Sequence, residues 1–143
     1  MRNKWLLRVL LAYAFFSSAW LAGSVPASAE PRLVSEARRY LGTNPTGRSS
    51  LWCGAFMDLV LRRTGHPGGG NLAKAYRRYG TKVSGPQVGA IAVIGRKGGG
   101  HVGVVSGVDP KGNPIIISGN HNHTVAESVY PRRRVIAYVM PEG

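Results

Sequence analysis

After residue 30, apolar and polar positions divide the chain into a helical first half and a strand-rich second half. Val34, Ala37 and Leu41 recur at the three- to four-residue spacing of an amphipathic helix that buries one face. The predicted helices span residues 33–41, a segment from Cys53 to the turn at Gly65 and Pro67, and residues 72–79. Ser49 or Ser50, just before the second helix, is its candidate N-cap.

From Gly85 onward, short apolar runs alternate with turns rich in Gly, Pro and Asn. Such runs are typical of strands, and such turns connect neighbouring strands of antiparallel sheets. The predicted strands span residues 90–94, 101–108, 115–118, 124–130 and 135–140. Because the helices precede the strands and do not alternate with them, the order predicts an α+β domain. Its N-terminal helices would pack on an antiparallel sheet of about five strands.

The first 29 residues have a different pattern. Three basic residues precede an apolar run over residues 9–25, and Ala27-Ser28-Ala29 then supplies the small residues of a signal-peptidase cleavage site. The run is just short of the about 20 residues that usually span a bilayer, so an uncleaved membrane anchor is the alternative. The cleavage-site pattern favours a signal peptide over that anchor. We therefore expect a signal peptide at 1–29 and one domain at 30–143. The protein would be exported, to a periplasm or outside the cell, with no stable membrane span after signal removal.

The charge of the chain is strongly positive, with 19 Lys and Arg against six Asp and Glu. Three of the basic residues and none of the acidic ones lie in residues 1–29, which leaves a formal net charge of +10 on residues 30–143. Such a charge indicates an anionic partner: a wall polymer, lipid headgroups or nucleic acid. The basic residues are scattered, few aromatics lie among them, and no nucleic-acid-binding motif is present, so we expect no nucleic acid partner.

Cys53 is the only cysteine of the chain and falls where a polar loop gives way to the second predicted helix. Unpaired N–H groups and the helix dipole favour the reactive thiolate in a first helical turn. In an exported protein, a cysteine without a partner indicates an intermolecular disulfide or a free reactive thiol. The alternative is a buried cysteine that acts as a small hydrophobe.

A cysteine nucleophile needs a base and usually a third group that orients the base. His101 opens a predicted strand directly after three glycines, whereas His66 lies in a predicted surface turn. If Val108 pairs near Ile115, His101 falls opposite residues 120–123. That segment offers four orienting candidates: Asn120, His121, Asn122 and His123. The spacing alone leaves the choice among them open.

Zinc binding is the competing interpretation of the same residues. Cys53, His101, His121 and His123 could supply mixed nitrogen and sulfur ligands. However, acidic residues are few near the histidines, and neither HExxH nor CxxC spacing occurs. We therefore expect no metal and no cofactor.

Five segments, in this order, resemble motifs of one enzyme superfamily. They are Ala37-Arg38-Arg39-Tyr40-Leu41-Gly42, Trp52-Cys53-Gly54-Ala55-Phe56, residues 86–93 (PQVGAIAV), residues 99–105 (GGHVGVV) and Ser118-Gly119-Asn120. Together they resemble the papain-like peptidoglycan hydrolases of the NlpC/P60 and CHAP superfamily, in particular a small bacterial subgroup. The chain departs from the wider superfamily at Ala90, where an aspartate is common.

The resemblance implies a papain-like fold and a monomeric cysteine peptidase or amidase that cleaves an amide bond in peptidoglycan. It assigns Cys53 as the nucleophile, His101 as the general base and Asn120 as the third residue. His121 and His123 remain alternatives for that third position. Two further readings stay open: a non-catalytic, cationic envelope-binding module of the same fold, and a secreted amidase directed against the walls of competitors.

Overall fold

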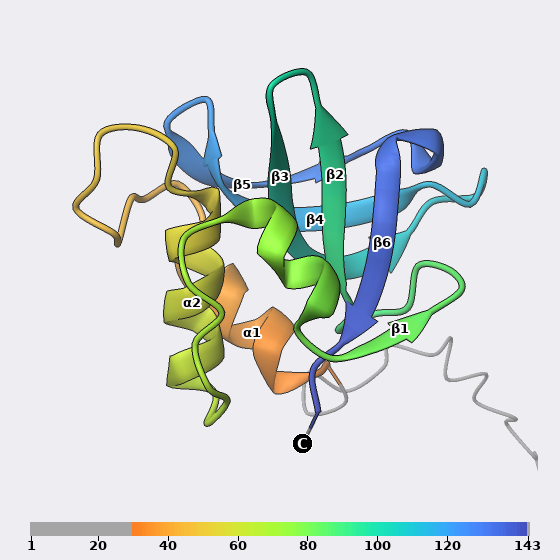
Figure 1. Cartoon of the computed structure of the whole chain (residues 1–143), viewed down its shortest axis with the longest axis horizontal. Helices are drawn as coiled ribbons and strands as arrows, with labels where there is room; N and C mark the ends of the chain where they lie inside the picture. Colours follow the sequence, from red (N-terminus) through yellow and green to blue (C-terminus); the bar gives the residue numbers. More distant parts are fainter. Residues whose placement is uncertain (1–29, 143) are drawn as a thin grey trace, which may run out of the picture.

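A computed structural model describes residues 30–142, in which helical segments pack on a six-stranded antiparallel sheet (Figure 1). The helical segments are α1 (Arg32–Arg38), α2 (Cys53–Arg63) and two 3-10 helices, η2 (Ala73–Arg78) and η3 (Arg132–Arg134). The strands are β1 (Thr81–Val83), β2 (Ile91–Arg96), β3 (Gly99–Val108), β4 (Pro114–His121), β5 (Thr124–Val129) and β6 (Val135–Met140). The predicted signal peptide lies outside the described residues. No helix within residues 30–142 is both long and apolar enough to cross a membrane.

The predicted α+β class, with helices ahead of an antiparallel sheet, is confirmed, whereas the prediction of about five strands is wrong. The sheet has six strands in the order β1-β6-β2-β3-β4-β5. The additional strand is β1, a three-residue edge strand that pairs only with β6 and has mostly exposed side chains. Only Val83 of this short strand is partly buried, so β1 leaves almost no hydrophobic pattern in the sequence.

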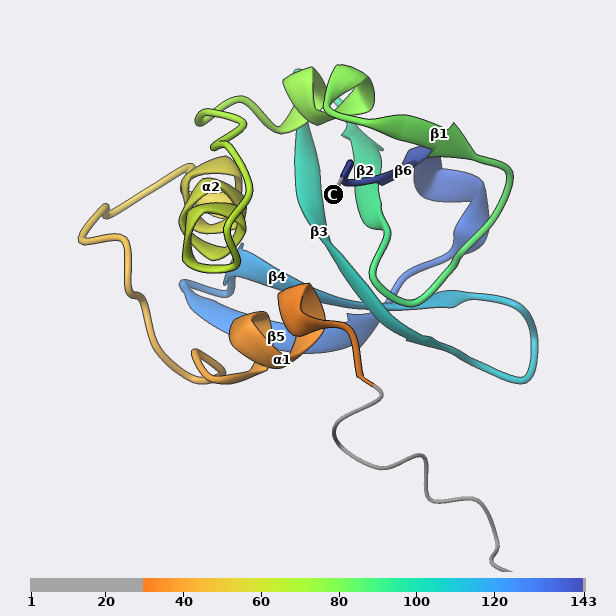
Figure 2. The same ribbon diagram turned by 90° about the horizontal axis from the view of Figure 1, so that it is seen from below.

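The central strands of the sheet are buried on both faces, with one cluster of buried residues on each side. The sheet is strongly curved, so that β4 and β5 run across the direction of β2 and β6 (Figure 2). In β2, Ile91 and Val93 pack with α1, α2 and η2, whereas Ala92 and Ile94 face the opposite side. This is the two-residue alternation of a strand with apolar residues in both registers. The opposite side holds a second, smaller core made of Ala90, Ala92, Ile94, Val105, Ile116 and Tyr130.

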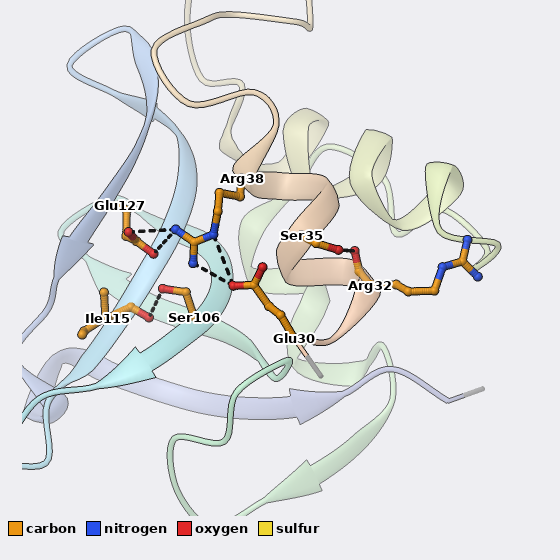
Figure 3. A network of polar contacts seen from close by, with 7 residues as sticks. All are labelled: Glu30, Arg32, Ser35, Arg38, Ser106, Ile115 and Glu127. Carbon is orange, nitrogen blue, oxygen red and sulfur yellow. Dashed lines mark hydrogen bonds and ion pairs between the residues drawn. The ribbon is translucent and has the colours of Figure 1, made fainter. Parts of the chain in front are cut away.

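A charged contact connects α1 to β5, the strand at one edge of the sheet (Figure 3). The guanidinium of Arg38 lies 2.9 Å from a carboxylate oxygen of Glu30 and 3.0 Å from one of Glu127 in β5. Hydrogen bonds to these two carboxylates, Glu30 first, raise the pKa of Arg38. Arg38 therefore connects three segments: the start of the described chain, α1 and β5.

Replacing Arg38 should cost little stability, because its side chain is 38% exposed and water screens both ion pairs. We expect Arg38→Ala to lower the free energy of unfolding by about 0.5–1.5 kcal/mol, as measured by urea denaturation. Arg39→Ala is the matched control, since Arg39 is 75% exposed and pairs only within its own segment, with Glu36. A loss above about 3 kcal/mol for Arg38→Ala would show that the contact is more than a surface ion pair.

Candidate active site

Cys53 is the first residue of α2 and only 9% of its surface is exposed. The N-cap of the helix is Trp52, so the prediction of Ser49 or Ser50 is wrong. Leu51, with φ of +51°, turns the chain between the serines and Trp52, which keeps the serine hydroxyls from the first turn. No side chain caps this turn. The first N–H groups of a helix have no intrahelical acceptor, so uncapped ones can bind an anion.

Trp52 and Phe56 fix the start of α2 against β4. Both are fully buried, and they pack on the backbone of Gly119 so closely that an added Cβ there would lie 2.8 Å and 2.6 Å from their side chains. Gly119 is therefore required for this close approach. The contact places the first turn of α2 beside Asn120.

The loop before η2 also packs against the first turn of α2, where Asn71 lies against Gly54. An added Cβ on Gly54 would lie 2.2 Å from the carbonyl oxygen of Asn71, so only glycine admits this loop. The hydroxyl of Tyr76 donates to the carbonyl of Gly70 at 2.7 Å and lies 3.1 Å from that of Gly54. Burial, followed by the charge of Asp58, raises the pKa of Tyr76, so its hydroxyl stays protonated.

Cys53 opens into a pocket of about 420 Å³. The pocket is lined by Leu51, Cys53, residues 71–75, Arg96, Gly98, Gly99, Gly100 and Asn120. Its lining thus combines the loop before α2, η2, the hairpin between β2 and β3, and the end of β4. The charged lining residues are Lys74 and Arg96, and no Asp or Glu is among them. The space beside the thiol therefore suits a neutral or anionic ligand.

His101 lies in β3, directly after two residues of this lining, and is 1% exposed. Its Nε2 is 2.8 Å from Oγ of Ser118 and 3.2 Å from the hydroxyl of Tyr130. The rings of His101 and Tyr130 stack, with centroids 5.8 Å apart. Neither partner was among the predicted site residues. Ser118 could have been found, because it lies two positions before Asn120 and thus on the same side of a regular strand.

The predicted register of the β3–β4 hairpin is confirmed to within one residue. Val108 pairs with Pro114, and Gly103 pairs with Ser118, which brings His101 opposite the end of β4. Asn122 and His123 form the two-residue turn to β5, with φ values of +51° and +65° that are typical of a type I′ turn. His123 is therefore at an exposed turn.

The buried position of His101 determines its charge. Burial first, and then the neighbours Arg96, His121 and Arg134, lower the pKa of His101 to about 3. The imidazole is therefore neutral at neutral pH, which favours a general base over a resting thiolate–imidazolium ion pair.

The two nitrogens of His101 differ in their surroundings. Nε2 has both hydrogen bonds, and Nδ1 has no partner within residues 30–142. Nδ1 is therefore the ring nitrogen of His101 that is left to accept a proton.

The structure brings the predicted residues to one end of the sheet without joining all of them. Cys53 and Asn120 line the same pocket, and Gly100 of its lining is bonded directly to His101. Within residues 30–142, no hydrogen bond connects the thiol of Cys53 or the amide of Asn120 to His101. His121 contacts Tyr130 through Nδ1 at 2.9 Å. His66 is remote, at a surface turn near Glu142.

In the described part of the chain, no group of three or more His, Cys, Asp or Glu side chains is arranged to hold a metal ion.

A helix with a cysteine in its uncapped first turn, packed on a curled antiparallel sheet that carries a buried histidine, defines a domain of the papain-like class. The model of the CHAP domain matches residues 44–120, more than half of the chain and the segment that includes Cys53, His101 and Asn120. The chain belongs to the CHAP family, which confirms the resemblance to the NlpC/P60 and CHAP superfamily. Membership of the small bacterial subgroup stays a prediction. No curated protein matches the chain.

CHAP domains are typically amidases or peptidases. Membership therefore indicates a hydrolase whose activity is related to peptidoglycan.

Proposed function

We propose that this protein is an exported cysteine amidase or peptidase that cleaves an amide bond in peptidoglycan, with Cys53 as nucleophile and His101 as general base. The observation that supports it most is the position of Cys53. The thiol lies at an uncapped helix N-terminus and opens into a pocket whose wall continues directly into His101. Export, removal of residues 1–29 and action as a monomer are parts of the same proposal.

The neutral imidazole determines how the attack would begin. Nδ1 of His101 takes the thiol proton as the sulfur of Cys53 adds to the carbonyl carbon of the substrate amide. The carbonyl oxygen becomes an oxyanion. The backbone N–H groups of Cys53 and Gly54 have no side-chain cap and stabilise this charge, aided by the dipole of α2.

The second half of the cycle returns the proton. Protonated Nδ1 of His101 donates to the leaving amine, the C–N bond breaks, and a thioester to Cys53 remains. Water then attacks the thioester with Nδ1 as its base, which releases the carboxylic acid and restores the thiol. Asn120, on the pocket wall, is placed to contact the substrate or the imidazole during this cycle.

Digestion of purified peptidoglycan tests the proposed function. Incubation with the protein should release new amino groups and carboxyl groups in equal amounts, and prior alkylation with iodoacetamide should stop the release. The alternative of a non-catalytic envelope-binding module predicts sedimentation with the polymer and no new amino groups. That outcome would overturn the proposed function.

The charge of the pocket predicts how an anionic substrate would be held. Lys74 is a lining cation that is not among the groups that shift the pKa of His101. We expect Lys74→Ala to lower kcat/KM by about 3- to 10-fold at low salt, mainly through KM, because an exposed charge acts on encounter and binding. The effect should shrink at high salt. Lys82→Ala, on the remote strand β1, is the control, and equal losses in both variants would contradict a specific role of Lys74.

A further inference from the structure

Tyr130 lies at the centre of a buried polar cluster behind the imidazole of His101. The residue follows β5 and is 5% exposed. Its hydroxyl is 2.9 Å from Nδ1 of His121, 3.2 Å from Nε2 of His101 and 3.4 Å from Oγ of Ser118. Its ring stacks on that of His101 and meets that of His121 edge-on. One hydroxyl hydrogen is thus available for three neighbours.

Two opposite arrangements of the hydrogens in this cluster give the two tautomers of His101. In the first, the Tyr130 hydroxyl donates to Nδ1 of His121, and Ser118 donates to the oxygen of Tyr130. Nε2 of His101 then carries a hydrogen and donates to Ser118. Nδ1 of His101 has no hydrogen and can accept one.

In the second arrangement, the donor and acceptor roles of the two histidines are exchanged. Nδ1 of His121 carries a hydrogen and donates to Tyr130, whose hydroxyl donates towards Nε2 of His101. Nε2 is then an acceptor, so the hydrogen of the neutral ring lies on Nδ1. A ring in this tautomer has no acceptor to offer the thiol of Cys53.

We propose that Tyr130 is a positioning residue that keeps His101 in the tautomer with hydrogen on Nε2, and that His121 holds the Tyr130 hydroxyl in the required direction. The positions of the atoms support the first arrangement. Once the Tyr130 hydroxyl donates its hydrogen to His121 at 2.9 Å, its oxygen is an acceptor 3.2 Å from Nε2 of His101 and 3.4 Å from Oγ of Ser118. Accepting a hydrogen bond from either atom favours a hydrogen on Nε2 of His101. Tyr130 thereby directs the hydrogen of Ser118 away from His101. The proposal rests on the proposed roles of Cys53 and His101.

Removing the hydroxyl should free Ser118. In Tyr130→Phe, the Ser118 hydroxyl loses its acceptor and can turn its hydrogen towards Nε2 of His101, which stabilises the wrong tautomer. We expect kcat to fall by about 3- to 10-fold, the factor of one neutral hydrogen bond, with KM unchanged. His121→Ala should act in the same direction, because it releases the Tyr130 hydrogen towards His101.

Tyr138→Phe is a matched control. It removes the same atom from the same side of the sheet, but the Tyr138 hydroxyl is fully buried without a partner. Its loss should leave kcat and KM unchanged and should not lower stability. A drop in kcat in both variants would show that any tyrosine hydroxyl on this side matters, and would overturn the specific role of Tyr130.

Nitrogen-15 NMR of the imidazole rings tests the proposal without any substrate. The wild type should show a protonated Nε2 and an unprotonated Nδ1 for His101 at neutral pH, and Tyr130→Phe should shift both resonances towards the opposite tautomer. An unchanged spectrum in a folded Tyr130→Phe variant would overturn the proposal. If the spectra change as expected while peptidoglycan stays intact, only the proposed function fails.

Discussion

Cys53→Ala should have no measurable amide hydrolase activity, a loss of at least about 10⁴-fold in kcat. Without the sulfur no thioester can form, and Nδ1 of His101 has no thiol from which to take a proton. The fold should survive, because the substitution removes one small atom at the edge of the core. Release of amino groups from peptidoglycan measures the activity, and thermal melting confirms the fold.

Cys53→Ser is the companion variant, because it keeps a hydroxyl nucleophile of similar size. A serine hydroxyl is a much weaker nucleophile than a thiol and needs a stronger base, so we expect a loss of at least about 10³-fold. Substrate binding, measured by sedimentation with peptidoglycan, should be kept in both variants. Activity of Cys53→Ala close to that of the wild type would remove Cys53 from the chemistry.

His101→Gln should lower kcat by about 10²- to 10⁴-fold, the usual contribution of a general base. Gln is close in size and can still donate to Ser118, but it cannot accept and return a proton at neutral pH. His66→Gln is the control, since His66 lies on the surface away from the pocket. A His101→Gln variant with wild-type kcat would show that another group deprotonates Cys53.

The lowered pKa of His101 leads to a second prediction, which concerns how the stability of the fold depends on pH. The folded-state pKa is about 3, below the ordinary value of 6.5, so the unfolded chain binds more protons between these values. The stability that this group contributes is full above pH 6.5 and is lost as the pH falls towards 3. The wild type should therefore lose on the order of a few kcal/mol across this interval.

His101→Gln should flatten that dependence, because glutamine does not titrate. Urea denaturation at pH 7 and at pH 4 measures the difference for the wild type, His101→Gln and His66→Gln. For the active enzyme, the acidic limb of the pH profile of kcat/KM should lie well below pH 6.5. An acidic limb near pH 6.5, together with an equal loss of unfolding free energy between pH 7 and pH 4 in the wild type and His101→Gln, would contradict a buried neutral imidazole.

The sequence contained most of the information needed for the fold. Helical spacing around Val34 and Phe56, and apolar runs between glycine-rich turns, predicted the helical half and five of the six strands. The strand β1 was missed because Thr81 and Lys82 are exposed and only Val83 is partly buried. The segment before it forms the 3-10 helix η2 and not the predicted helix over 72–79. The Tyr76 hydroxyl of η2 contacts the carbonyl oxygens of Gly70 in the preceding loop and of Gly54 in α2.

The candidate site was predictable in part. Cys53 was indicated by its position before an apolar run, and His101 by the glycines that precede it. The structure places both residues at one end of the sheet. Of the partners of His101, Ser118 could have been found from its place two positions before Asn120, whereas Tyr130 could not, because its position depends on the exact pairing of β4 with β5. That pairing is interrupted between Ser118 and His121 and cannot be read from spacing.

The start of α2 shows how a rule can fail at a functional position. Capping preferences favoured Ser49 or Ser50, and the helix begins instead at Cys53 after an unfavourable left-handed turn at Leu51. A capped helix would have its first N–H groups occupied by a side chain. Leaving them free is consistent with their proposed role at the oxyanion, and local strain of this kind is concentrated at functional sites.

The most direct test of the central claim is the identification of the acyl-enzyme. The protein is mixed with peptidoglycan fragments, quenched in acid during turnover, digested with a protease and analysed by mass spectrometry. We predict a substrate-derived acyl group on the peptide that contains Cys53, at increased occupancy in enzyme quenched early. Steady release of amine without any adduct on Cys53, or with an adduct on another residue, would contradict the claim that Cys53 is the nucleophile.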